Sequence, residues 1–137
     1  MTAEEAVDSV LSRLNTMWLP TTYLMIWPFT ASEVPTAQVP WANCKIEHID
    51  SRRLTLGDAE GKALWERVGK LIVEVCFPAD KSKNDMYPLT DAILNTFEGK
   101  KTAEGVRFLN PHRSELGVVD GWLRMKVVIN FKYEDYK

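Results

Sequence analysis

The sequence predicts an α+β fold, with a mostly antiparallel sheet that includes a long hairpin and two helices packed on one face. Two segments, about residues 3–17 and 85–97, repeat apolar residues at the spacing of amphipathic helices. Other segments alternate apolar and polar residues as strands do, with turn residues between them, which favours hairpins. One apolar sheet face and two amphipathic helices are all buried if both helices lie on that face.

Composition fits one globular domain, which we expect to span residues 1–137. The chain has 137 residues, of which 45% are apolar, which is typical of one domain with its own core. Its net charge of −2 and lack of a basic run disfavour a nucleic-acid-binding protein. Two cysteines in no CxxC motif, an acidic N-terminus and no long apolar run predict a cytoplasmic protein without a membrane segment.

Both predicted helices carry recognisable end signals. Thr2 and Glu5 form a capping-box pattern before the helix over 3–17, because each side chain can bond the other's free backbone N–H. The helix over 85–97 is followed by Gly99, a residue typical of the position just after a helix.

The remaining periodic segments predict strands. They cover about residues 22–27, 42–56, 63–77, 105–114 and 121–133. The alternation is imperfect around Ile46 and Ile49, which indicates a bulge. Asp120-Gly121 predicts a tight turn before the last strand. The acidic end, Glu134-Asp135, is interpreted as a frayed terminus.

The strands over 42–56 and 63–77 predict an unusually long hairpin. Its arms exceed the usual strand of about 5–6 residues, so we expect part of it to leave the sheet and project. Apolar residues near the tip need a partner that shields them from water. The residues predicted to contact another subunit there are Leu54, Leu56, Leu64 and Trp65.

Tryptophan is abundant, with five in the chain. Trp18 is assigned to the core. Trp27 and Trp41 flank a proline-rich segment, 28–40, to which the sequence assigns no role, and Trp122 falls on the polar side of the last strand. Tryptophan is enriched at protein interfaces, so these last three are further subunit-interface candidates.

No set of residues in the sequence predicts catalysis or metal binding. Cys44 and His48 share one face of a strand, but no third ligand lies at a fitting spacing. Residues 110–115 hold a histidine, a serine and a glutamate too close together for a catalytic triad, and are interpreted as a polar loop. Asp58 and Glu60 are interpreted as a solvated turn, and no phosphate-binding loop occurs. We therefore expect no enzyme, no metal and no cofactor.

Three segments carry a resemblance to a known family. Residues 70–78 read as a strand ending in proline, 92–102 as a helix that breaks into a basic turn, and 121–134 as an alternating strand. Together with the N-terminal helix, they resemble the tail terminator-like proteins of long-tailed bacteriophages.

The resemblance implies a subunit of a hexameric ring in the virion tail, assembled in the host cytoplasm. Such a ring caps the tail tube, stops its polymerisation and joins it to the head–neck connector. The expected partners are further copies of the chain, the tail tube protein and the connector protein. DNA would pass through the lumen, and the net charge predicts that it is not bound tightly.

Two alternatives stay open at this point. One is a head–tail connector of the same virion, which differs from a terminator only in its partners. The other is a small-ligand-binding accessory domain with a pocket between helices and sheet. Self-association separates the ring subunit from the ligand-binding domain.

Overall fold

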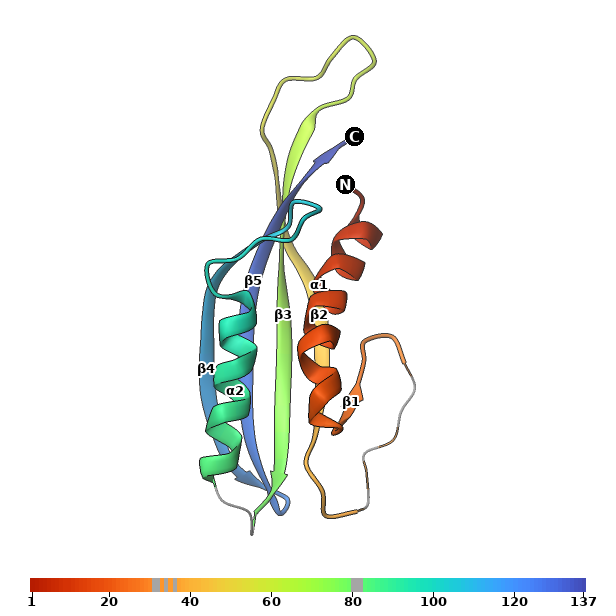
Figure 1. Cartoon of the computed structure of the whole chain (residues 1–137). Coiled ribbons are helices and arrows are strands. Elements are labelled where there is room, and N and C mark those ends of the chain that lie inside the picture. Colours follow the sequence, from red (N-terminus) through yellow and green to blue (C-terminus); the bar gives the residue numbers. More distant parts are fainter. Residues whose placement is uncertain (31–32, 34, 36, 80–82) are drawn as a thin grey trace.

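The computed structural model describes residues 1–30, 33, 35, 37–79 and 83–137. Within these residues, two helices cover one face of a five-stranded sheet of order β1-β2-β3-β5-β4 (Figure 1). The elements are α1 (Ala3–Trp18), a short 3-10 turn (Leu19–Thr21), β1 (Leu24–Ile26), β2 (Trp41–Arg53), β3 (Leu64–Pro78), α2 (Lys83–Phe97), β4 (Arg107–Val119) and β5 (Trp122–Tyr136). The predicted α+β class is confirmed.

The sheet is antiparallel except where β1 runs parallel to the start of β2. β4 and β5 are joined by the two residues Asp120 and Gly121, with φ angles of 52° and 81°. Positive φ at both positions is the geometry of the hairpin turn that matches the twist of paired strands. The predicted turn is confirmed.

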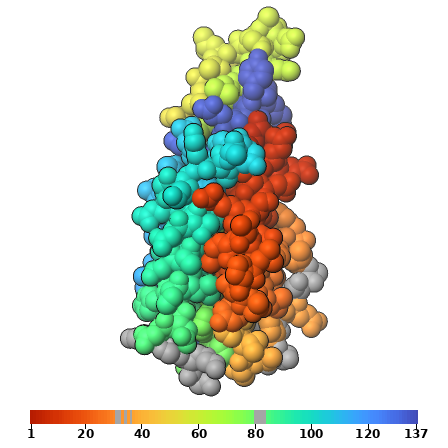
Figure 2. All heavy atoms as spheres, viewed as in Figure 1, coloured from red at the N-terminus to blue at the C-terminus, as the bar shows by residue number. Residues whose placement is uncertain are grey.

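The core lies between the sheet and the two helices, which lie side by side in Figure 2. α1 begins with the predicted capping box, because Thr2 and Glu5 exchange two hydrogen bonds of 3.0 and 3.1 Å. Alternate side chains of β3 and β5 point to the helices. The fully buried ones include Leu71, Val73, Val75, Val127, Ile129 and Phe131.

The predicted bulge in β2 is also confirmed. The pairing with β3 shifts between His48 and Asp50, so Ile49 is the extra residue. Ile49 is 48% exposed, and the residues on either side of it, His48 and Asp50, are exposed as well.

The hairpin projects at its tip as expected (Figure 1), but the expectation that its arms are too long to be paired in the sheet is wrong. β2 pairs with β3 as far as Arg53↔Trp65, and β3 pairs with β5 as far as Leu64↔Tyr136. The arms are therefore paired throughout, and only the loop over 54–63 projects. The reason is that β5 continues past the predicted end at 133, so the interpretation of the acidic end as frayed is wrong as well.

Two further sequence interpretations need correction. Residues 110–115 lie in β4 and not in a loop, and a positive φ of 49° at Asn110 accompanies a register shift there. The first strand is shorter than 22–27, because Thr22 has a φ of 61° and caps the 3-10 turn instead of extending. The proline-rich segment lies partly outside the described residues.

Candidate interaction surfaces

The loop over 54–63, called the tip here, stands beyond the helices and the C-terminus (Figure 1). Backbone and side-chain bonds close its base. The N–H of Leu54 donates to the carbonyl oxygen of Leu64 at 2.7 Å, and the N–H of Leu64 donates to the Thr55 hydroxyl at 2.9 Å. The tip is therefore a braced loop.

Asp58 organises the outer part of the tip. One carboxylate oxygen accepts the N–H groups of Glu60 and Lys62 at 2.8 and 2.9 Å, and the other accepts the Tyr136 hydroxyl. The hydrogen bond from Tyr136, followed by that from Lys62, lowers the pKa of Asp58 below its ordinary value. The prediction of a turn at Asp58 and Glu60 is confirmed.

Two leucines stand out on this braced loop. Leu56 is 92% exposed and Leu54 is 38% exposed. Single exposed apolar residues are common on protein surfaces. Leu54 and Leu56, however, stand on a loop that is held by its own hydrogen bonds, and a loop that is already ordered loses less conformational entropy when it binds a partner. Their role in an interface stays a prediction.

Trp65 and Leu64 lie at the base of the tip, both half-buried. The guanidinium carbon of Arg67 lies 5.0 Å from the centroid of the Trp65 ring, a cation–π arrangement. Arg67 also contacts the carboxylate of Asp135 at 3.6 Å and donates to the Ser51 hydroxyl. Trp65 belongs to neither buried cluster of the described residues, so part of its ring is open to a partner.

Below the tip, the sheet continues past the helices and leaves a groove of about 600 Å³. Its lining includes His48, Arg67, Tyr133, Asp135 and the start of α1. The His48 Nε2 and the Tyr133 hydroxyl are 2.7 Å apart. This groove could not be predicted from the sequence, because the end of β5 forms one wall and the acidic pair Glu134-Asp135 is typical of a frayed end.

Trp41 and Trp122 lie on the sheet face turned away from the helices. Their rings meet edge to face, with centroids 6.0 Å apart, and they pack with Cys76. Only 2% of Trp41 and 8% of Trp122 are exposed, and the Trp41 Nε1 has no hydrogen-bond partner among the described residues. These indoles fill a small second core, so they offer a partner little surface. The interface assignment of both remains untested.

Trp27 is half-buried beside α1. It packs against the main core and, with Leu11 and Asn15, lines a shallow groove on α1. Of the seven interface candidates, only the four hairpin residues come together at one end of the molecule; Trp27, Trp41 and Trp122 lie elsewhere.

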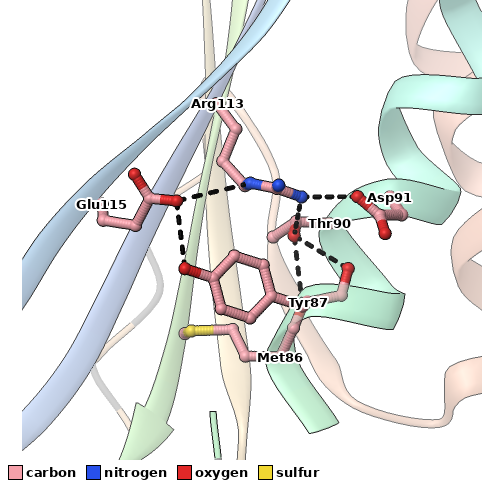
Figure 3. Close-up of polar contacts among 6 residues, drawn as sticks. All are labelled: Met86, Tyr87, Thr90, Asp91, Arg113 and Glu115. Carbon is pink, nitrogen blue, oxygen red and sulfur yellow. Dashed lines mark hydrogen bonds and ion pairs between the residues drawn. The ribbon is translucent and has the colours of Figure 1, made fainter. Parts of the chain in front are cut away.

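A polar cluster fastens α2 to β4 (Figure 3). The Arg113 guanidinium contacts Asp91 at 2.5 Å, Thr90 at 3.2 Å and Glu115 at 3.6 Å, and lies 4.7 Å from the centroid of the Tyr87 ring. The Tyr87 hydroxyl donates to Glu115 at 3.2 Å, and this bond raises the pKa of Tyr87. Both carboxylates of the cluster, Asp91 and Glu115, pair with Arg113, so the cluster attaches α2 to β4.

The cysteines are poor candidates for chemistry. Cys44 and Cys76 are buried, and burial raises the pKa of each thiol to about 12. No three His, Cys, Asp or Glu side chains among the described residues are grouped to hold a metal ion. In that same part of the chain, the helices are too short or too polar to span a membrane.

Comparison with known proteins adds information on the fold. No family model matches the chain, and no curated protein matches its sequence. A solved chain that carries only a sequence identifier matches with a TM-score of 0.72 at 12% identity, covering 100% of this chain and 99% of that chain. The two share one fold. A chain from a virion of a native gene transfer agent particle matches with a TM-score of 0.47 at 15% identity, covering 93% of this chain and 92% of that chain.

Proposed function

We propose that this chain is a structural subunit of a phage virion, a ring-forming tail terminator. In this role it caps the tail tube, stops tube polymerisation and joins the tube to the head–neck. The braced tip with its exposed Leu56 is the observation that carries an assembly role. The tail position rests on the sequence resemblance of 70–78, 92–102 and 121–134.

A ring needs two different patches that meet head to tail. The tip is suited to be one of them, because it projects beyond its own domain and brings Leu54 and Leu56 within reach of a neighbour. Six copies, the tail tube protein and the connector protein are the partners we propose. The subunit acts through these contacts and without catalysis, in a virion tail assembled in the host cytoplasm.

The decisive measurement is the mass of the purified protein in solution across a concentration series. We expect the wild-type chain to form oligomers as concentration rises. The variant Leu56→Asp places a charge where a leucine is 92% exposed, so it should stay monomeric and keep its melting temperature.

The matched control is Val118→Asp, which changes another exposed apolar residue, 63% exposed, two residues before the turn that joins β4 to β5. That turn lies at the end of the sheet opposite the tip (Figure 1). This variant should associate as the wild-type chain does. A wild-type chain that stays monomeric at all concentrations contradicts the ring and favours the ligand-binding domain. A second assay separates a terminator from a connector: a terminator, when added to growing tail tubes, should inhibit their growth.

We expect only weak binding of duplex DNA. Six copies, each with a net charge of −2, carry a net charge of −12. Two arginine side chains on the sheet face turned away from the helices are also neutralised by acidic neighbours. Arg124 pairs with Glu74 at 2.8 Å, and Arg107 pairs with Glu134 at 3.7 Å. Affinity for DNA comes largely from Lys and Arg that neutralise phosphates.

A gel-shift titration with duplex DNA at physiological salt checks this expectation. No shift should be seen at submicromolar protein. A submicromolar dissociation constant would show that the distribution of charge matters more than the net charge.

A further inference from the structure

The C-terminal end of the chain is attached to the base of the tip. Ala63 and Lys137 exchange two backbone hydrogen bonds of 3.1 and 3.0 Å, which extend the pairing of Leu64 with Tyr136 by one step. The Tyr136 side chain is thereby directed at the tip, where its hydroxyl reaches Asp58.

Asp58 receives contacts from both sides of the turn. Its carboxylate accepts from the N–H groups of Glu60 and Lys62, its own N–H donates to the Lys62 carbonyl at 2.7 Å, and its carbonyl accepts the N–H of Gly61 at 3.0 Å. A side-chain carboxylate that bonds backbone groups two and four residues on fixes the turn locally. Tyr136 adds a side-chain contact that ties this turn to the sheet.

We propose that Asp58 and Tyr136 are positioning residues that hold the tip in the shape in which Leu56 binds a second copy of the chain. This inference rests on the proposed function. Leu56 is 92% exposed, so packing against the core does not hold it in place. Its position follows from the hydrogen bonds of the loop, and Asp58 makes most of these outside the base.

Bracing matters for binding because a loose loop must be ordered when it binds. A loop that is already ordered before binding does not lose binding free energy to this ordering. Removing the brace should therefore weaken association without touching Leu56 itself. It should also leave the core intact, because Tyr136 is 55% exposed and packs in neither buried cluster.

Three variants test the inference, with association followed by solution mass across a concentration series. Tyr136→Phe removes only the hydroxyl and should weaken association about three- to tenfold, the net worth of one hydrogen bond. Asp58→Ala should weaken it further. Asp58→Asn should fall between wild type and Asp58→Ala, because its amide oxygen still accepts the two backbone N–H groups.

A matched control is Tyr87→Phe, which removes another hydroxyl that donates to a surface carboxylate, here on Glu115 at 3.2 Å and away from the tip. It should associate as wild type does. All four variants should keep the wild-type melting temperature. Amide hydrogen exchange across 58–62 should speed up in Tyr136→Phe and stay unchanged in Tyr87→Phe.

The outcomes separate the inference from the function on which it rests. If Leu56→Asp abolishes association while Tyr136→Phe and Asp58→Ala associate as wild type does, the tip binds without the brace, and only the inference is overturned. Unchanged exchange across 58–62 in Tyr136→Phe overturns it too. If Leu56→Asp associates normally, the tip is not the contact, and the inference and the proposed tip contact both fail.

Discussion

The variant Gly69→Ala is expected to lose about 3 kcal/mol of folding stability, the upper range for overpacking a core. A Cβ on Gly69 would lie 2.3 Å from the Phe131 ring and 2.6 Å from the carbonyl oxygen of Glu47. Phe131 is fully buried, and His48 meets its ring edge to face with centroids 5.9 Å apart. Glycine is needed here because backbone and a packed ring occupy the place of a side chain.

Urea unfolding of the monomer, read by tryptophan fluorescence, checks this value. The control is Gly57→Ala in the tip, whose added Cβ would meet the end of the flexible Arg53 side chain at 2.8 Å. That side chain can move, so the change should stay within about 0.5 kcal/mol. The double variant Gly69→Ala/Phe131→Leu should lose less folding stability than the two single variants lose together, because the Phe131 ring is one of the two groups that the added Cβ would meet. A Gly69→Ala protein as stable as wild type would show that the strand shifts easily.

Local signals in the sequence predicted most of the fold. The capping box at Thr2 and Glu5, the bulge at Ile49 and the turn at Asp120 depend on neighbouring residues, and all three are confirmed. The parallel pairing of β1 with β2 was not predicted, because it depends on where the connecting segment brings the chain back. Alternation within a three-residue strand carries no information about its neighbour.

The candidate site was predicted less well, for a physical reason. The pair Glu134-Asp135 is acidic, and acidic residues near a terminus are typical of a frayed end. In the structure, β5 continues through it, because backbone pairing with β3 does not depend on apolar side chains and Arg107 and Arg67 pair with the two carboxylates. The groove and the contact of Tyr136 with the tip both depend on this extension of β5, so neither could be predicted from the sequence.

The tryptophans also differ in burial in a way that their spacing in the sequence does not predict. Trp122 was placed correctly on the side of its strand away from the helices, and from there exposure was expected. Instead, its ring contacts that of Trp41 on the same face of the sheet, over the intervening strand β3, and Trp122 is 8% exposed. Two large rings from separate strands can cover each other, and a sequence pattern that treats each strand alone does not include that contact.

The second large effect is expected from Trp65→Ala, on association more than on folding. Trp65 is half-buried at the base of the tip and lies outside both buried clusters, with Arg67 over its ring at 5.0 Å. Truncating a tryptophan that anchors a neighbouring subunit costs about 2 kcal/mol or more per interface, which weakens association more than tenfold. The loss of folding stability should be near 1 kcal/mol.

Trp122→Ala provides the opposite case. Trp122 is 8% exposed, so its truncation should remove about 3–5 kcal/mol of folding stability. Melting temperature and oligomer mass are measured on both variants under the same conditions. We expect Trp65→Ala to shift toward monomer while melting close to wild type, and Trp122→Ala to melt far lower. If the monomer of Trp65→Ala also loses 3–5 kcal/mol, then Trp65 is a folding residue whose exposed edge has no partner, and the ring contact must lie with Leu54 and Leu56 alone.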